Sequence, residues 1–317
     1  MHNQASNSVS VKPLLASIIG WGLFLPVTPS LADEPLFGYV YTTDLLPQGK
    51  YEVEQWITDR AQQAHGRFND VLLRSEFEYG LTNDLQIAGY LNYSYLNANR
   101  NSVQHLTEGM DIPASHDAGQ PFDEWRYDGI SVELIWRVLS PYKDGLGLAF
   151  YAEPEYGPRE KGLELRVITQ KNFFDDRLVL AANLWVEPER EDSSNLTMPG
   201  AGEMPEGGKM RATMAEIDLG ASYRFAPNWS AGLEFRNHNE YSGYSLSHDD
   251  QEHTAFFFGP NIHYAAQRWF VTVAALHQIY AKAYDEEQEA QIRDNLIYGD
   301  EHTRWDGIRT KIGYTFE

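Results

Sequence analysis

The sequence contains no cysteine, which excludes both a disulfide framework and a cysteine-ligated metal site. Long apolar runs are also rare, because no segment after residue 32 approaches the roughly 18 consecutive apolar residues of a membrane-spanning helix. Basic residues are few, with 25 Lys and Arg against 46 Asp and Glu. The formal net charge of −21 repels polyphosphate, so we expect no nucleic-acid partner.

The first 32 residues have the pattern of a secretory signal. Lys12 is their only charged residue, residues 14–27 form an apolar run, and Ser30-Leu31-Ala32 offers small side chains to a signal peptidase. The apolar run is shorter than the roughly 20 residues that a spanning helix needs, so a signal peptide is favoured over a membrane anchor. We predict cleavage between Ala32 and Asp33.

The last residues of the chain are the most informative segment that is present. Ile308, Ile312, Tyr314 and Phe316 alternate with polar or small residues such as Arg309. This period of two places apolar side chains on one face of a strand and polar ones on the other. Such a pattern, ending on an aromatic residue, is typical of the strand that closes a bacterial outer-membrane β-barrel.

Earlier segments show the same period, and their lengths near ten residues suit tilted membrane strands. We predict twelve strands in all, at residues 50–60, 70–80, 85–96, 126–139, 146–156, 162–172, 178–187, 213–225, 230–241, 254–264, 270–283 and 304–316.

The connections between these strands alternate in length. Five are tight and contain turn-forming Asn, Asp, Pro or Gly, at residues 81–84, 140–145, 173–177, 226–229 and 265–269. The others are mostly longer and polar, as expected for short periplasmic turns and longer outer loops. We therefore predict an all-β fold, a transmembrane antiparallel up-and-down β-barrel at residues 50–317. Residues 33–49 are predicted as a periplasmic lead-in segment, which either plugs the lumen or merely leads into the barrel.

The two faces can be assigned in most strands. In residues 215–225, Ile217, Leu219 and Phe225 share one face, while Glu216 and Asp218 share the other. A slip of one residue would put the polar set into lipid, so the register is strongly specified. The strand at 270–283 does not alternate cleanly, and its facing stays open. Tyr, Trp and Phe gather beside the short turns, where an interfacial girdle is expected.

Charged residues at the inward positions are expected to line the lumen, and they are Arg74, Glu76, Glu78, Glu133, Arg137, Glu216, Asp218, Arg224, Glu234, Arg236, Arg309 and Lys311. Unpaired charges in a narrow lumen are costly, so these groups should pair across strands or stay hydrated. An acidic excess favours a pore for cations, whereas complete pairing would close the lumen. Twelve strands lie between a filled barrel of eight and an open channel of sixteen, so the count does not decide.

Other chemistry is weakly indicated. His238 precedes Ser242, Ser245 and Ser247, as a serine hydrolase site would need, but the pattern of the known barrel phospholipase is not recognisable. The acidic loops at residues 248–253 and 285–289 carry hard ligands for a divalent cation, although solvated loops are favoured. We expect no catalytic residue, cofactor or bound metal. The long loop at residues 97–125 is a candidate constriction if it folds inward.

Two short motifs carry a resemblance to a known family. They are Leu46-Pro47-Gln48-Gly49-Lys50 and Glu78-Tyr79-Gly80-Leu81-Thr82-Asn83. With them the chain resembles a proteobacterial outer-membrane family of unknown function, akin to barrels loosely linked to the degradation of aromatic compounds. The resemblance implies a barrel and assigns no catalytic or binding residue.

Together these patterns predict a passive pore of the Gram-negative outer membrane for small polar or cationic solutes. Its expected partners are outer-membrane lipid, lipopolysaccharide and the barrel-assembly machinery. A non-conducting structural or adhesion barrel with an ion-paired lumen is the alternative, and an outer-membrane lipid or ester hydrolase is less favoured.

Overall fold

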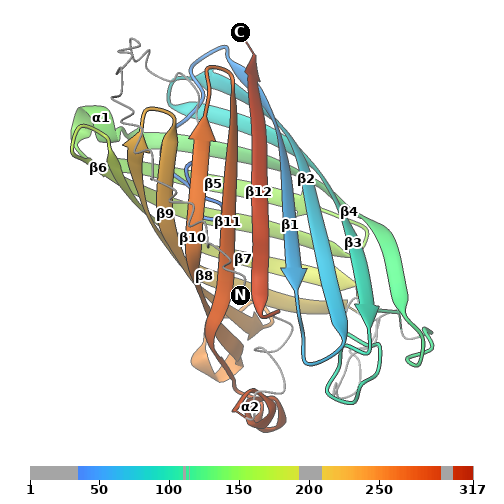
Figure 1. The fold of residues 1–317 in the computed structure, drawn as a ribbon. Helices are drawn as coiled ribbons and strands as arrows, with labels where there is room; N and C mark the ends of the chain where they lie inside the picture. The colour runs from blue at the N-terminus through green and yellow to red at the C-terminus, as the bar shows by residue number, and fades with distance from the viewer. Residues whose placement is uncertain (1–34, 110–111, 114, 193–208, 294–302, 317) are drawn as a thin grey trace, which may run out of the picture.

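The computed structural model describes residues 35–109, 112–113, 115–192, 209–293 and 303–316. The predicted signal peptide and its cleavage position lie outside these residues. Twelve antiparallel strands form one closed barrel in which each strand pairs with its neighbours in sequence and β1 pairs with β12 (Figure 1). The strands are β1 Tyr51–Ala61, β2 Arg67–Thr82, β3 Leu85–Asn99, β4 Phe122–Leu139, β5 Gly147–Tyr156, β6 Glu160–Phe173, β7 Leu178–Asp192, β8 Lys209–Ala226, β9 Trp229–Ser242, β10 Gln251–Ala265, β11 Trp269–Ala283 and β12 Trp305–Phe316.

The predicted barrel and its strand count are confirmed. The closing strand β12 lies against β1 with Tyr51 opposite Phe316 and Thr58 opposite Arg309. Within the described ranges, no helix has both the length and the apolar character needed to cross a membrane.

Several strands run further than predicted at one end of the barrel. The strand predicted at 178–187 continues to Asp192, which pairs with Lys209 of β8. The added residues are mostly charged, among them Glu189 and Arg190. The alternation of apolar residues, from which the strand was predicted, therefore stops before the strand does. Backbone pairing between adjacent strands needs no apolar face, and it continues beyond the point where that pattern stops.

The connections alternate in length as expected. The short-turn end of the barrel carries the two-to-seven-residue links after β2, β4, β6, β8 and β10, and one of these contains helix α1, Pro141–Asp144. The opposite, long-loop end carries most of the longer connections, including a 3₁₀ turn at His248–Asp250 and helix α2, Glu286–Arg293. Figure 1 shows the C-terminus at the short-turn end and α2 at the long-loop end. The connection at residues 193–208 lies outside the described part of the chain.

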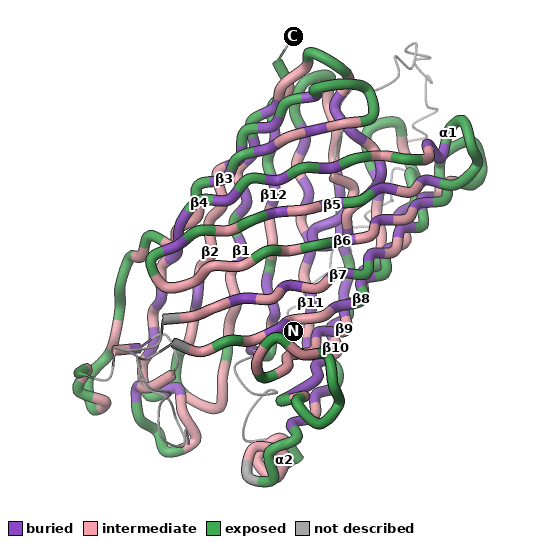
Figure 2. Tube along the Cα trace, turned by 180° about the vertical axis from the view of Figure 1, so that it is seen from behind, coloured by how far each residue is buried: buried purple, intermediate pink, exposed green. Residues whose placement is uncertain are grey.

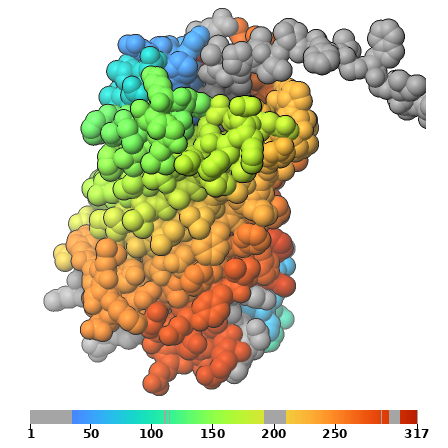
Figure 3. All heavy atoms as spheres, turned by 90° about the vertical axis from the view of Figure 1, so that its left-hand side faces the viewer, coloured from blue at the N-terminus to red at the C-terminus, as the bar shows by residue number. Residues whose placement is uncertain are grey.

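The outer face of the wall is apolar. Ile130, Val132, Leu134, Trp136 and Val138 of β4 are each 41–54% exposed, and they alternate with buried or half-buried neighbours (Figure 2). Seen from one side, the side chains form a continuous surface (Figure 3). A sheet that exposes its apolar residues outward and buries its charged ones is suited to lipid and not to water.

Aromatic rings cluster at the short-turn end. Tyr51 stacks on Phe316 with ring centroids 5.1 Å apart, and Tyr264 lies 4.8 Å from Trp229 and 5.2 Å from Trp269. Tyr and Trp favour the membrane interface because one part of each ring is apolar and another can hydrogen-bond to water. This arrangement corresponds to the aromatic girdle expected from the sequence.

Of the two roles left open for residues 33–49, the described residues 35–49 take the one inside the lumen. They run through the lumen before the chain reaches β1, and Phe37, Val40, Thr43 and Leu46 are each buried. We call residues 35–50 the lumenal segment. The segment lies in the lumen because the inner wall offers it both apolar contacts and hydrogen-bond partners, which water outside the barrel would not bring together in one place.

Candidate functional site

The lumenal segment is anchored most tightly at Glu234, which projects inward from β9. One carboxylate oxygen accepts a hydrogen bond from the backbone N–H of Gly38 at 2.8 Å, and the other accepts from Tyr39 at 2.7 Å and Val40 at 3.2 Å. Asn261 of β10 donates to the same carboxylate at 2.8 Å. Hydrogen bonds to an ionised acceptor are stronger than neutral ones, so this carboxylate fixes three consecutive residues of the segment.

Side-chain amides from three other strands continue the anchoring. Asn183 of β7 accepts from the N–H of Tyr41 at 2.7 Å and donates to its carbonyl at 2.9 Å. Gln170 of β6 accepts from the N–H of Thr43 at 2.7 Å, and Gln86 of β3 accepts from the N–H of Leu46 at 2.8 Å. These amides take the place of a strand partner, since they satisfy backbone groups that would otherwise be buried without hydrogen bonds.

Apolar contacts with the inner wall also hold the lumenal segment in place. Phe37 packs with Val179 and Ala181 of β7, and its ring covers Gly220 of β8 so closely that a built Cβ on that glycine would lie 2.7 Å from it. Gly38 approaches Ala274 of β11 just as closely, with a built Cβ 2.4 Å from the alanine Cβ. Any larger residue at either glycine would displace the segment.

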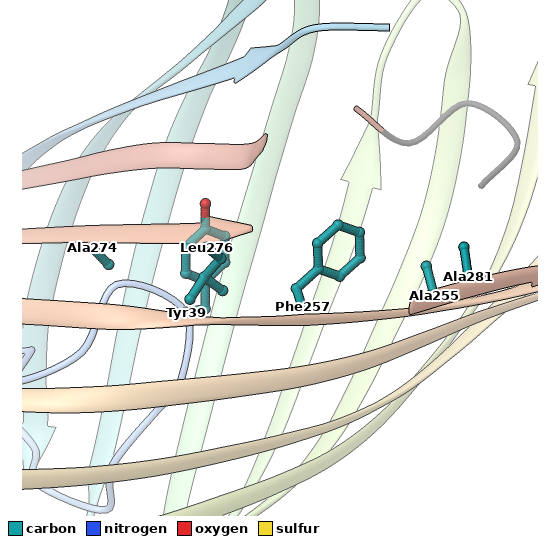
Figure 4. Close-up of a cluster of buried hydrophobic side chains, with 6 residues drawn as sticks. All are labelled: Tyr39, Ala255, Phe257, Ala274, Leu276 and Ala281. Carbon is teal, nitrogen blue, oxygen red and sulfur yellow. The ribbon is translucent and has the colours of Figure 1, made fainter. Parts of the chain in front are cut away.

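Tyr39 belongs to a buried cluster on the inner faces of β10 and β11. Its neighbours are Ala255, Phe257, Ala274, Leu276 and Ala281, which lie along the inner wall (Figure 4). The inward residues Ala274 and Leu276 of β11 are apolar where they pack in one cluster with Tyr39 of the lumenal segment. This settles the facing of the strand whose sequence does not alternate cleanly.

A large cavity, which we call the vestibule, occupies the lumen on the long-loop side of the segment. It has a volume of about 1190 Å³, and Tyr39, Tyr41 and Trp56 are among the residues that line it. A second cavity of about 40 Å³ lies on the short-turn side of the vestibule, and we call it the lower cavity. It is lined by Val40, Tyr41, Thr42 and Trp56 among others. Tyr41 and Trp56 contribute to both cavities, so they lie between them and form the narrow part of the lumen.

The vestibule is strongly acidic. Among its described lining residues, 17 are Asp or Glu and 7 are Arg. Low-dielectric walls lined by one sign of charge concentrate counter-ions, so this chamber attracts cations.

The arginines at the floor of the vestibule are paired with acids. Arg236 contacts Glu216 at 2.5 Å and also forms an ion pair with Asp306 across the lumen. Arg166 lies 3.2 Å from Asp218 and 2.7 Å from Glu164. The pairing offsets positive charge that would otherwise repel a cation entering from the long-loop end.

Aromatic rings also cover these cations. The guanidinium of Arg309 lies 3.9 Å from the ring centre of Tyr39, and that of Arg74 lies 4.0 Å from Tyr90 while pairing with Glu153. Cation–π contacts of this kind gain strength when they are desolvated. The floor is therefore a rigid layer of paired arginines and rings.

The charged residues predicted to line the lumen fall into three groups in the structure. Eight are buried, and they are Glu76, Glu78, Glu133, Glu216, Asp218, Glu234, Arg236 and Lys311. Arg74, Arg137 and Arg309 are half-buried. Arg224 differs from the prediction, because it is exposed near the end of β8 and reaches over the short turn to the carbonyl of Asp175 at 3.5 Å.

The loop residues proposed for catalysis or metal binding are placed differently. The hydroxyl of Ser245 donates to Asp250 at 2.5 Å, and the Ser247 oxygen accepts from the N–H of Asp249 at 3.3 Å, so both serines are used within their loop. His238 contacts Glu216 through Nδ1 at 2.8 Å. His253 groups with His238 and Glu240, and not with the acids of its own loop.

The long loop predicted at 97–125 lines the vestibule and does not form the constriction. Asn101, Ser102 and Glu108 contribute to the vestibule wall, and Ile112 packs with Leu96 near the ends of β2 to β4. The sequence left open whether residues 33–49 plug the lumen, so it did not single out the lumenal segment as the part that narrows it. Its signals were the apolar inward residues of β11 and the isolated inward amides such as Asn183.

These features define the class of protein, a transmembrane β-barrel of the outer-membrane type whose lumen holds a segment of its own chain. The chain belongs to a family of unknown function (DUF6662), whose model matches residues 29–316. No curated protein matches it.

Among solved structures, the chain is similar to the COG4313 outer membrane channel from Pseudomonas putida F1, with a TM-score of 0.52, 10% identity, and coverage of 86% of this chain and 97% of that one. It is also similar to the NanC porin, with a TM-score of 0.46, 8% identity, and coverage of 84% and 99%. The CymD monoaromatic hydrocarbon channel matches with a TM-score of 0.41, 11% identity, and coverage of 90% and 98%. At this level of identity the first likeness shows the fold alone.

Proposed function

We propose that this protein is an outer-membrane channel that admits small polar or cationic solutes, with the lumenal segment as its constriction. The observation that carries the proposal is the acidic vestibule of about 1190 Å³ at the long-loop end. A barrel filled with side chains would not contain such a chamber. A channel, in contrast, has a space where solutes gather before they pass the narrow part at Tyr41 and Trp56. No catalytic step is part of the proposal.

The orientation follows from the loops. Short turns face the periplasm and longer loops face outward in barrels of this type, so the vestibule opens to the exterior. In this arrangement the signal peptide at residues 1–32 directs export, and the apolar outer wall contacts outer-membrane lipid and lipopolysaccharide after the assembly machinery has inserted the barrel.

The main test is conductance in a planar bilayer. We expect discrete openings whose reversal potential, in a salt gradient, lies on the side of cation preference, because the acids of the vestibule outnumber its arginines. Replacing Glu108 with Gln and Asp285 with Asn, two acids of its wall, is expected to weaken that preference without loss of folding.

A silent but correctly folded barrel would contradict the channel and favour the alternative, a non-conducting structural barrel. That alternative is supported by one observation, the occupation of the lumen by a segment held through hydrogen bonds to four strands.

A second test asks whether the segment must shift for a solute to pass. The lower cavity of about 40 Å³ has room for only a few water molecules, since each needs roughly 10–15 Å³ of such space, so a larger solute requires displacement of the segment. A built Cβ on Gly147 lies 3.1 Å from the Cβ of Thr43, so a backbone shift of a few tenths of an ångström brings the pair to the roughly 3.5–4.5 Å of a disulfide. We expect oxidised Thr43→Cys, Gly147→Cys protein to admit solutes more slowly in a liposome-swelling assay, and reduction to restore the rate.

The matched control is Thr43→Cys alone, which should not respond to oxidation, because the natural chain has no cysteine to pair with it. Equal swelling rates in the oxidised and reduced double variant would show that the segment does not move during passage.

A further inference from the structure

On the short-turn side of the vestibule, the inner wall of β1, β2 and β4 carries an unusual set of acids. Glu52, Glu54, Glu76, Glu78 and Glu133 are each 0–7% exposed. Glu54 lies directly opposite Glu76 in the pairing of β1 with β2, and Glu52 lies opposite Glu78. Like charges placed directly across two strands repel each other, so the arrangement needs a compensating positive charge or protons.

The contacts that the structure shows around these acids supply little positive charge. Glu54 accepts from Trp56 Nε1 at 2.6 Å, Glu78 from Gln86 Nε2 at 2.7 Å, and Glu133 from the Tyr90 hydroxyl at 2.6 Å. All three donors are neutral, so they orient the carboxylates without cancelling their charge.

Lys311 of β12 is the basic residue that lines the lower cavity with them, and its ammonium lies 3.6 Å from the ring centre of Trp56. The carboxylates that line this cavity are those of Asp44, Glu54, Glu76, Glu78 and Glu133, so with one ammonium they leave a net charge of −4 if all are ionised. Arg74, above them, pairs with Glu153 of β5. Burying an excess of one sign of charge in a low-dielectric site is costly, so this charge favours the binding of a cation.

Among the acids that line the lower cavity, Glu76 has a carboxylate oxygen without a hydrogen bond. Glu76 is 3% exposed, and its Oε2 is buried with no hydrogen-bond partner. Glu76 lines the lower cavity together with Glu54 and Glu78, and one carboxylate oxygen from each of these three residues lies within 4.8 Å of the other two. A cavity of about 40 Å³ exceeds the roughly 10–15 Å³ that a water-sized occupant needs.

We propose that Glu54, Glu76 and Glu78 form a binding site for a divalent cation of the calcium type. Three oxygens at this spacing can surround one ion at the distances of about 2.3–2.6 Å that calcium prefers, and water in the lower cavity completes the coordination. Calcium suits the site better than magnesium, because magnesium demands near-ideal octahedral geometry at shorter distances.

The position of the site has a consequence for the lumenal segment. Val40, Tyr41 and Thr42 of the segment line the same cavity, so they enclose the ion from the lumen side. A cation here joins β1 to β2 directly below the constriction and stabilises the wall against which Tyr41 and Trp56 pack. The site does not depend on conduction, so its test and the test of the channel can fail separately.

Terbium provides a direct measurement, because it replaces calcium and emits when a nearby tryptophan is excited. The ring of Trp56 is hydrogen-bonded to Glu54 and therefore lies beside the proposed ion. The full mature chain, folded in detergent and freed of metal with a chelator, is titrated with terbium in salt that screens the exposed loops. We expect sensitised emission that calcium displaces, and a large loss of emission in Trp56→Phe.

Glu76→Gln tests the ligand set, since it keeps the shape of the side chain and removes the charge. We expect its affinity for terbium and calcium to fall by about tenfold or more, as for changes around other metal sites, and its calcium-dependent rise in Tm to disappear. Glu78→Gln serves the same purpose if the first variant does not fold. The matched control is Asp249→Asn with Asp250→Asn in the exposed loop, which should keep both responses.

Three outcomes would overturn the site. Terbium emission that is absent in the wild-type barrel would mean that protons, and not a metal ion, neutralise the acids. A rise in Tm that persists in Glu76→Gln and Glu78→Gln, or that vanishes in the loop control, would place the bound calcium on the exterior acids.

Discussion

Replacing Glu234 with alanine is expected to free the lumenal segment and to increase the conductance of the barrel severalfold. The carboxylate accepts hydrogen bonds from Gly38, Tyr39 and Val40, and the substitution leaves three buried N–H groups without an acceptor. Each hydrogen bond to a charged group contributes about 1.5–3 kcal/mol, so the segment loses the largest part of its attachment at this point. Single-channel recording measures the effect.

Glu234→Gln is the matched control, because the amide keeps one acceptor oxygen and the same shape. We expect an intermediate conductance and a Tm between those of the wild type and the alanine variant. Unchanged conductance in Glu234→Ala, with the barrel folded, would show that these hydrogen bonds do not hold the constriction in place.

Replacing Arg236 with methionine is expected to destabilise the barrel by about 3–5 kcal/mol, the usual effect of removing one member of a buried ion pair. The side chain of Arg236 is 11% exposed and those of its partners Glu216 and Asp306 are 1% and 5% exposed, so Glu216 stays buried without its arginine and Asp306 keeps only Arg60, at 3.8 Å. Urea unfolding of the protein in lipid vesicles measures the loss. The double variant Arg236→Met, Glu216→Gln should recover part of it, because one stranded charge is removed.

Arg159→Met provides the comparison. Arg159 pairs with Asp128 at 2.7 Å, but the two side chains are 31% and 26% exposed. Exposed pairs contribute about 0–1 kcal/mol, so this change should have little effect. Equal losses in the two variants would mean that the pairs at the floor of the vestibule are hydrated and not buried.

The barrel wall could be predicted because its signal is local. In β8, Ile217 and Leu219 face outward and Glu216 and Asp218 face inward, as the period of two requires, and turn residues mark where each hairpin reverses. The same reasoning left the facing of β11 open, because its inward residues are not polar. Phe270 and Leu276 meet protein and not water.

The contents of the lumen could not be predicted because they rest on contacts between distant residues. Glu234 and Gly38 are 196 positions apart, and alternation can tell which face a residue occupies but not what lies opposite it. The same limit applies to the charges. Inward Arg236 and Glu216 were identified, while the contact of Arg236 with Asp306 depends on where strands meet across the barrel. The three acids around the lower cavity likewise come together only through the pairing of β1 with β2.

The path of the lumenal segment bears on the order in which the molecule can be built. Residues 35–50 precede β1, yet their hydrogen-bond partners Gln170, Asn183 and Glu234 belong to β6, β7 and β9. While only the first hairpins exist, the segment has almost nothing to bind, so its docking comes late although it is translated early. The wall must either fold around this leading stretch of chain or admit it before the seam between β1 and β12 seals.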